Sequence, residues 1–215
     1  ELDCSDEFWL EDTQVLTRPA ATLTLLQSLP RSKRRDALRT PTGTLVRSET
    51  FGLDSAPYND RPYSVQEGAF GVRAEAKQDD SLSERSIFFA FPVASRTSQW
   101  ERGHEPMTTF SFTGDYDAYG QARATTAMSV PRGTNFMVGG SAPYLVTRSA
   151  NEFIYADTTG QYMTNRVKRA LVYEFTNSGN GSVFTLMASI EADTATKSLI
   201  GLAINYYDGT AFTGL

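Results

Sequence analysis

His104 is the only histidine in the chain and therefore the only imidazole that could serve as a general base. It stands in the stretch Arg102-Gly103-His104-Glu105-Pro106, which is typical of a turn between strands. The sequence contains no Gly-x-Ser-x-Gly elbow, no phosphate-binding loop and no dinucleotide fingerprint. We therefore interpret His104 as a surface turn residue rather than a catalytic base.

Three aspartates are the carboxylates most suggestive of a site: Asp115, Asp117 and Asp208. The Asp-x-Asp pair precedes Gly120 and could begin a calcium loop, but the spaced oxygen ligands and terminal glutamate of an EF-hand do not follow. Aspartates commonly bond to the backbone of their own turn, which is how we interpret this pair. A hydrolase with a carboxylate pair stays open as an alternative, because distances between carboxylates are invisible in a sequence.

Metal-binding side chains are scarce, since His104 and Cys4 are the only residues of their types. They are too few for a zinc site of four such ligands, and a single cysteine excludes an intrachain disulfide. Asn180-Gly181-Ser182 matches the glycosylation triplet but falls inside a predicted turn. We predict no catalytic, cofactor-binding or metal-binding residue, no cofactor and no enzyme activity.

The net charge of −5 argues against nucleic acid as a partner, because a duplex-binding surface needs clustered basic residues. The one dense basic run is Arg31-Ser32-Lys33-Arg34-Arg35. We interpret this run as a solvated helix end, with a phosphate or partner contact as the alternative. No apolar run approaches about 20 residues, so no membrane span is expected.

The first secondary structure that the sequence predicts is helical, over residues 19–39. Pro19 suits a first-turn position, and Pro30 divides the pattern into two short helices, the second from Arg31 to Leu38. Leu23, Leu26 and their neighbours form the apolar stripe that such helices pack on a sheet.

After Pro41 the sequence is rich in strand formers, and aromatic residues make up 12% of the chain. Residues 161–168 could form a short helix or a crossing loop, and Asn177 to Gly181 predicts a hairpin turn between two strands. The run Ile87 to Phe91 is typical of a strand buried on both faces. About ten strands are predicted, at residues 45–51, 63–74, 87–91, 108–113, 121–130, 144–147, 153–156, 170–175, 183–190 and 199–206.

The predicted fold class is mainly β, with an antiparallel sheet or sandwich and one or two short N-terminal helices. Residues 1–40 are expected to form a helical or extended N-terminal segment, and residues 41–215 a β-rich domain. The linker-like composition of residues 131–142 places a possible seam there.

Six stretches occur in a distinctive order along the chain: Ala37-Leu38-Arg39, Gly43-Thr44-Leu45-Val46-Arg47-Ser48-Glu49-Thr50-Phe51-Gly52-Leu53-Asp54, Arg61-Pro62-Tyr63-Ser64-Val65-Gln66-Glu67, Gln99-Trp100-Glu101-Arg102, Asp115 to Gln121, and Tyr206 to Leu215. Together they resemble the middle-to-C-terminal region of the B component of insecticidal toxin complexes. The piece Tyr116 to Gln121 is also similar to one copy of the Tyr-Asp (YD) repeat of Rhs proteins.

The B and C components of that family form a large β-sheet shell that encloses a cytotoxic C-terminal enzyme before delivery. The resemblance implies a secreted, non-enzymatic structural segment of this shell that contributes surface and pairing edges. The implied partners are the remainder of the toxin shell and the C component, and the killing activity resides elsewhere.

A carbohydrate- or receptor-binding β-sandwich is the main alternative, with a glycan or receptor as partner. In that case exposed aromatic rings such as Trp9, Trp100, Tyr206 and Tyr207 would stack on sugars. A hydrolase built on Asp115, Asp117 and Asp208 is the third hypothesis.

The chain begins with Glu1 instead of methionine and ends at Leu215 inside one of the six stretches. We therefore expect a piece cut from a larger protein. A shell segment without its neighbours would expose edge strands and apolar faces, and we expect this at Ile87 to Phe91 and at Tyr206 to Leu215.

Overall fold

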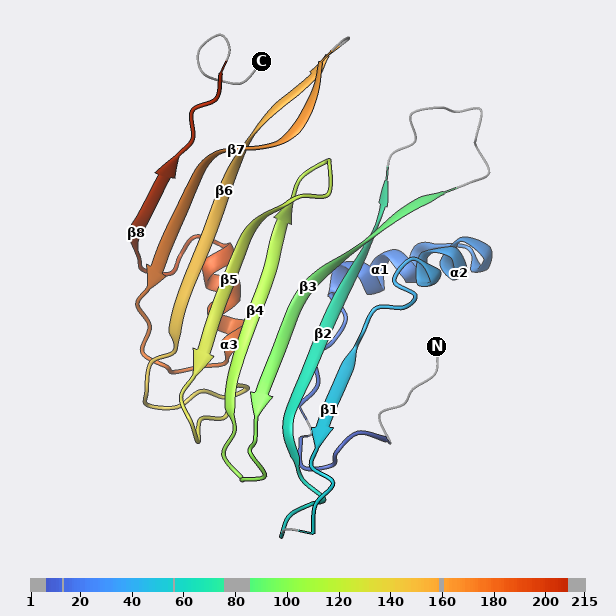
Figure 1. The fold of residues 1–215 in the computed structure, drawn as a ribbon. Coiled ribbons are helices and arrows are strands. Elements are labelled where there is room, and N and C mark those ends of the chain that lie inside the picture. Colours follow the sequence, from blue (N-terminus) through green and yellow to red (C-terminus); the bar gives the residue numbers. More distant parts are fainter. Residues whose placement is uncertain (1–6, 13, 56, 76–85, 159–160, 209–215) are drawn as a thin grey trace. The chain divides into compact units, whose positions relative to one another are not determined.

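The computed structural model describes residues 7–12, 14–55, 57–75, 86–158 and 161–208 (Figure 1). The chain divides into two compact units, Glu1–Thr108 and Thr109–Leu215. Residues 131–142 lie inside the second unit. The division into residues 1–40 and 41–215, like the seam, stays a prediction.

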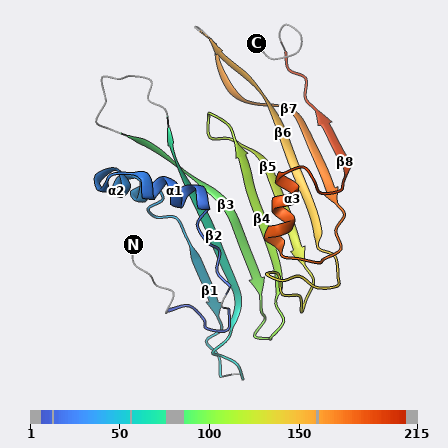
Figure 2. The same ribbon diagram turned by 180° about the vertical axis from the view of Figure 1, so that it is seen from behind.

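The first unit combines two helices with an antiparallel meander in which β2 pairs with both β1 and β3. Its described elements are α1 (Ala20–Ser28), α2 (Arg31–Arg39), β1 (Arg47–Phe51), β2 (Pro62–Glu75) and β3 (Ile87–Gln99). The two helices lie across one face of these strands (Figure 2). Leu26, Ala37 and Val72 are buried together in their contact with the sheet, and the buried Thr22 hydroxyl of α1 accepts a hydrogen bond from the Val72 N–H at 3.0 Å.

Prolines set the bounds of both helices. Pro19 and Pro30 are the residues just ahead of α1 and α2, each with an extended backbone. A residue that precedes proline is pushed out of the helical region, and Leu29 accordingly has a ψ of 141°. The predicted pair of short helices is confirmed.

The second unit is a five-strand antiparallel meander with one helix packed on a face of it (Figure 2). Its described elements are β4 (Met107–Tyr116, which begins just ahead of the unit), β5 (Ala122–Val130), β6 (Leu145–Thr158), β7 (Gln161–Phe175), α3 (Val183–Glu191) and β8 (Lys197–Ile204). The ring of Phe184 on α3 meets those of Phe110 and Phe112 on β4 edge-on, at centroid distances of 6.0 and 6.2 Å. These aromatic contacts attach the helix to the strands.

The prediction of a mainly β, antiparallel fold with short helices near the N-terminus is confirmed. The described residues contain eight strands instead of about ten, for two reasons. Residues 144–147 and 153–156 fall along one long strand, β6, and residues 183–190 are not a strand.

The strand predicted over residues 183–190 was wrong, because this segment is helix α3. Val183, Met187 and Ile190 are its buried residues, a spacing of four and three that places them on one helical face. The Ser182 Oγ accepts a hydrogen bond from the Thr185 N–H at 3.0 Å and caps the first turn. The short apolar run was compatible with either element.

Two neighbouring predictions were wrong as well. Residues 161–168 are neither helix nor crossing loop but the first half of β7. Asn177 to Gly181 connects β7 to α3 and not to another strand, although Gly179 and Gly181 do adopt the positive φ angles expected of a turn.

Strand β8 differs from the other strands in its exposure. Seven of its eight residues are exposed and only Gly201 is half-buried. Leu199, Ile200 and Leu202 each keep more than half of their surface accessible. Ile87, on β3, is 55% exposed, and the four residues after it are half-buried. The exposure expected for residues 87–91 is therefore confirmed, whereas the prediction that this run is buried on both faces was wrong.

Within the described ranges, no helix is long and apolar enough to cross a membrane. Cys4, residues 76–85 and the last seven residues lie outside these ranges.

Candidate functional site

The N-terminal segment (residues 7–12 and 14–18) is fastened to the first unit by acidic side chains of the sheet. The Trp9 N–H donates to Glu49 Oε1 at 3.1 Å, and the Leu16 N–H donates to Glu67 Oε2 at 3.3 Å. Between these two points Asp12 is buried, with 7% of its surface exposed. The segment is thus held by carboxylates at both ends.

Asp12 belongs to an ionic cluster of five side chains: Asp12, Arg47, Glu49, Glu67 and Arg96. Arg96 donates to both carboxylate oxygens of Asp12, at 2.9 and 2.7 Å, and through Nε to Glu67 Oε2 at 2.9 Å. Arg47 donates to Glu67 Oε1 at 2.5 Å, to Glu49 Oε1 at 2.7 Å and to Asp12 Oδ2 at 3.1 Å. The bidentate Arg96–Asp12 pair has the geometry of the strongest protein ion pairs.

Strand register explains the core of the cluster. Arg47 on β1 is the direct pairing partner of Glu67 on β2, and Glu67 is in turn the partner of Arg96 on β3. A row of alternating charge therefore crosses three adjacent strands, the arrangement in which cross-strand pairs of opposite charge meet. Glu49 joins the row because it follows Arg47 by two residues and so faces the same side of β1.

The cluster is almost free of solvent. Side-chain exposure is 1% for Arg96, 2% for Glu67, 4% for Asp12 and Arg47, and 13% for Glu49. Burial alone lowers the pKa of Arg47, but its hydrogen bonds to Glu49 and Glu67 and the charge of Asp12 raise that pKa above its ordinary value. The carboxylates around Arg47 therefore hold its guanidinium in the charged form.

This geometry supports a structural role. Each carboxylate already accepts from at least one guanidinium, and two also accept from backbone N–H groups of the N-terminal segment. A general acid or base must exchange a proton with a substrate within hydrogen-bond reach. These carboxylates are instead committed to holding β1, β2, β3 and the N-terminal segment together.

A second contact joins the stretches that carry the family resemblance. Arg102 donates to the Gly52 carbonyl at 3.1 Å, pairs with Asp54 at 2.9 Å and lies 4.5 Å over the ring of Tyr63. A Cβ added to Gly52 would lie 2.1 Å from the Arg102 Nη2 and 2.8 Å from the Tyr63 ring, so a larger residue there would displace these side chains. Arg47, Glu49 and Glu67 of the ionic cluster belong to the same stretches, which therefore meet in space as structural contacts.

His104 lies, as predicted, in the turn between strands that follows β3, and it is exposed. Its ring nitrogens contact the Arg61 guanidinium, with Nε2 at 2.9 Å from Nη1. Arg61 also pairs with Glu11 at 3.7 Å. The imidazole thus faces a cation.

The predicted Asp turn is confirmed for Asp117 and not for Asp115. Asp117 Oδ1 accepts from the N–H groups of Tyr119 and Gln121 at 2.9 and 2.8 Å. Asp115 has a φ of 54°, and its side chain pairs with Arg123 at 2.6 Å. Asp208 is exposed near the end of the described chain.

Asp117 also accepts a hydrogen bond from the Tyr155 hydroxyl at 2.7 Å. Burial by itself raises the pKa of Asp117, but the bonds from Tyr155, Gln121 and Tyr119 and the nearby Arg123 charge bring that pKa below its usual value. Burial and the hydrogen bond to Asp117 raise the pKa of Tyr155 to about 12. No group of three metal-ligating side chains occurs in the part of the chain that the structure describes.

The four aromatic residues considered for sugar stacking fall into two pairs, one in each unit. Trp9 and Trp100 meet edge-on at 4.7 Å, and Trp100 is only 9% exposed. Tyr206 is 74% exposed, while Tyr207 donates its hydroxyl to the Val167 carbonyl at 2.8 Å. Trp100 is therefore packed inside the first unit and presents no ring face of the kind that stacks on sugars.

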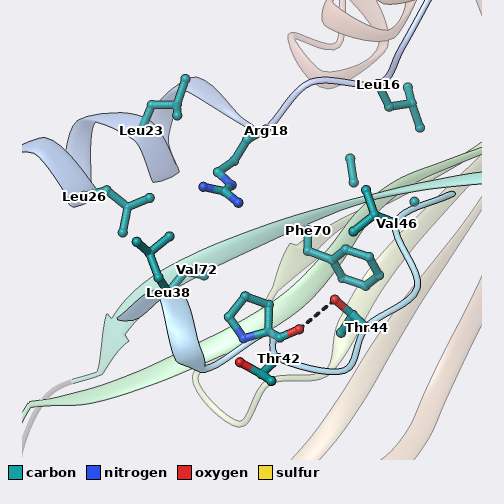
Figure 3. A pocket seen from close by; sticks show the side chains of 13 residues that line it. Leu16, Arg18, Leu23, Leu26, Leu38, Thr42, Thr44, Val46, Phe70 and Val72 are labelled. Atoms are coloured by element: carbon teal, nitrogen blue, oxygen red, sulfur yellow. Dashed lines mark hydrogen bonds between the residues drawn. The ribbon is translucent and has the colours of Figure 1, made fainter. Parts of the chain in front are cut away.

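The first unit contains an apolar pocket of about 470 Å³ between its helices and β2 (Figure 3). The helices contribute Leu23, Leu26 and Leu38 to its lining, and the chain around β1 and β2 contributes Val46, Phe70 and Val72. Arg18 extends from the segment before α1 towards this space, and Thr42 and Thr44 lie at its lower rim in the view. The volume falls in the range of small ligand sites.

Sequence reasoning missed the ionic cluster, although one signal pointed to it. Glu67 alternates with Val65 and Ala69 on β2, and all three are buried on one face. A charged residue at an inward position of a strand predicts a buried partner of opposite charge. Its partners could not be identified, because Asp12 lies 84 residues from Arg96.

Comparison with known proteins agrees with this fold. The crystal structure of TcdB2-TccC3 matches with a TM-score of 0.74 and 18% sequence identity, covering 95% of this chain and 11% of that chain. The structure of the Photorhabdus luminescens Tc holotoxin pore matches with a TM-score of 0.75, 18% identity and the same coverage. The chain thus spans 11% of the length of the solved chains that it resembles.

No curated protein matches the chain in sequence. The family model described as "Insecticide toxin TcdB middle/C-terminal region" matches residues 36–178, about two thirds of the chain. This match confirms the resemblance to the B component of insecticidal toxin complexes. The chain belongs to the family of the insecticide toxin TcdB middle/C-terminal region.

Proposed function

We propose that this chain is a non-enzymatic wall segment of the β-sheet shell of a secreted toxin complex. In this role it helps to enclose or deliver a cytotoxic C-terminal domain. Family membership supports a structural toxin-complex component, and the solved structures of similar fold contain a TccC3 partner. Its partners are the remainder of the shell and the C component, and we extend the proposal to a kinship with Rhs proteins.

The observation that carries the proposal is the outer edge of β8. This strand pairs with β7 on one side, from Arg169↔Ile204 to Phe175↔Lys197. Among the described residues no strand pairs with its other side, and β8 ends the strand order. Backbone donors and acceptors along that edge are available to a further strand.

The side chains of β8 agree with a neighbour on that edge. Four apolar residues of β8 are 48–55% exposed: Leu199, Ile200, Leu202 and Ile204. Ile200 is the extra residue of a β-bulge, which interrupts the alternation of faces between Leu199 and Gly201. Isolated domains protect such an edge with charges, proline or a bulge. Strand β8 has a lysine only at its first residue and one bulge, at Ile200, so its outer edge is protected only in part. An apolar edge of this kind suits a wall in which sheets continue from one segment into the next.

A segment exchange tests the proposal. The corresponding region of TcdB2 is replaced by this chain, and the chimera is produced with TccC3. A wall segment should permit assembly, so TccC3 should co-purify and its C-terminal region should resist added protease. Assembly that fails for the chimera while intact TcdB2 succeeds would contradict the wall role.

Edge variants sharpen the test. Ile200→Lys together with Leu202→Lys places two charges on β8 and should abolish protection in the chimera. Leu10→Lys with Leu53→Lys makes the same chemical change at two residues that are 80% and 102% exposed and lie off the edge, so this control should protect normally. Equal protection by both pairs would remove β8 as the joining edge.

A further inference from the structure

Helix α2 concentrates positive charge in an acidic chain. Its nine residues include Arg31, Lys33, Arg34, Arg35 and Arg39 against a single acid, Asp36. The helix therefore carries a net charge of +4, and the rest of the chain carries −9 to reach the total of −5. Such separation of charge creates a local positive field.

The positions of these charges are unfavourable for the stability of α2 as an isolated helix. No acidic residue occupies the first turn of α2, and no side chain caps its N-terminus. Arg31, Lys33 and Arg34 stand at the end where the helix dipole favours anions. Arg31, Arg35 and Arg39 follow at intervals of four, a spacing at which like charges repel. An anionic partner would relieve both effects.

The arginines are also accessible. They line a hollow of about 800 Å³ together with Ser32 and Leu38. The Arg35 side chain is 66% exposed, and its ion pair with Asp36 spans 3.9 Å. The opposite face of the helix is anchored by Ala37, which is fully buried in the first unit. The charged face can therefore change without disturbing the core.

Leu38 lines both this hollow and the apolar pocket of Figure 3, so the two spaces are neighbours. One surface of the first unit thus offers a basic face and an apolar recess side by side. We propose that the basic face of α2 and the apolar pocket together bind an acidic protein segment. Its carboxylates pair with the arginines, and one of its apolar side chains enters the pocket.

A protein segment fits this surface better than other polyanions. Four of the five basic residues are arginine, whose planar fork matches a carboxylate in bidentate fashion. The recess takes an apolar side chain, which a phosphate backbone does not supply. A duplex or an anionic membrane would also face the net −9 of the remaining chain, whereas a short segment contacts only α2 and the pocket beside it.

The test uses the whole chain and a dye-labelled peptide that repeats Glu-Glu-Leu, followed by fluorescence anisotropy. Binding should weaken as salt rises, since exposed ion pairs are screened. The triple variant Arg31→Gln, Arg35→Gln, Arg39→Gln should weaken binding by about tenfold, in the range for several exposed ion pairs. Neutralising the exposed Arg132, Arg166 and Lys168 of the second unit removes the same charge and should leave affinity unchanged.

The pocket has its own test. Thr42→Trp fills the rim and should weaken the Glu-Glu-Leu peptide without affecting an all-glutamate peptide; Thr24→Trp, an exposed site outside the pocket, is the matched control. Circular dichroism establishes that each variant is folded. Three outcomes would each overturn the proposal. They are equal binding by the triple variant and its control, no binding by the parent chain, and tighter binding of duplex DNA or phosphatidylserine vesicles.

Discussion

At the scale of single residues, the first unit depends on charges that would be costly if left alone. Arg96 is 1% exposed and serves both Asp12 and Glu67. Removing water from a charge costs several kcal/mol, which only close partners offset. The ion pairs in this cluster therefore contribute little net stability. Their main effect is to determine which segments of the chain pack together.

Replacing Arg96 by methionine should destabilise the first unit by about 3–5 kcal/mol, because Asp12 and Glu67 would lose their shared buried partner. Both tryptophans, Trp9 and Trp100, lie in the first unit and touch, so their fluorescence during urea unfolding reports on that unit. Arg35→Gln, which breaks the exposed pair with Asp36 in the same unit, should change stability far less, because solvent screens that pair. Similar losses in the two variants would refute the distinction.

The Tyr155 hydroxyl should ionise only at unusually high pH. Its folded pKa of about 12 lies above the ordinary value of 10.0, so its bond to Asp117 stabilises the fold fully below pH 10. That contribution is lost as pH rises towards 12. In a spectrophotometric titration, Tyr155→Phe should remove the latest tyrosinate step, whereas Tyr162→Phe should leave it. A late step that survives in Tyr155→Phe would assign it to another tyrosine.

At the scale of elements, side-chain hydrogen bonds and close backbone contacts fix a turn of the second unit. The Asn177 side chain exchanges two hydrogen bonds with the backbone of Tyr144, at 2.9 and 2.7 Å. Gly179 has a φ of 76°, and a Cβ placed there would lie 2.0 Å from the Ala142 carbonyl oxygen. Both the angle and the space at this turn call for glycine.

Gly179→Ala should therefore destabilise the second unit by more than the roughly 1–2 kcal/mol that a left-handed conformation alone costs an L-residue. Gly181→Ala is the matched control, because Gly181 also has a positive φ, 95°, but its Cβ would meet nothing within 4 Å. Thermal unfolding followed by circular dichroism measures both. Equal destabilisation would mean that the backbone relaxes around the clash.

Patterns in the sequence predicted most elements because burial follows local periodicity. Pro19 and Pro30 punctuate the helices, and alternation identifies strands such as β2. The prediction failed at residues 183–190, because a short apolar run fits both a strand and a helix. Only the Ser182 cap distinguishes the helix from a strand here. Local patterns are least informative where an element is short.

The candidate site was less predictable than the fold. The turn of Asp117 follows from residues two and four positions away, so its hydrogen bonds were foreseeable. The ionic cluster depends on register across three strands and on a residue 84 positions distant. Long-range partners of this kind are absent from any local window.

At the scale of the whole molecule, the apolar edge of β8 should govern association. Without a neighbouring strand, Ile200 and Leu202 remain exposed beside unpaired backbone groups, which favours edge-to-edge pairing between chains. Sedimentation velocity should show self-association that grows with concentration. Ile200→Lys with Leu202→Lys should give a monomer, and Leu10→Lys with Leu53→Lys should not; a parent chain that stays monomeric throughout would contradict this.

The N-terminal segment also imposes an order on folding. Asp12 leaves the ribosome early but binds Arg96, and Arg96 reaches its place only when β3 pairs with β2. The first residues of the unit are therefore among the last to settle, because closing so long a loop must wait for the strands. During synthesis the Asp12 carboxylate remains solvated by water until Arg96 is in place to pair with it. A chain interrupted before β3 would leave the segment around Asp12 without its anchor, in a state that proteases can reach.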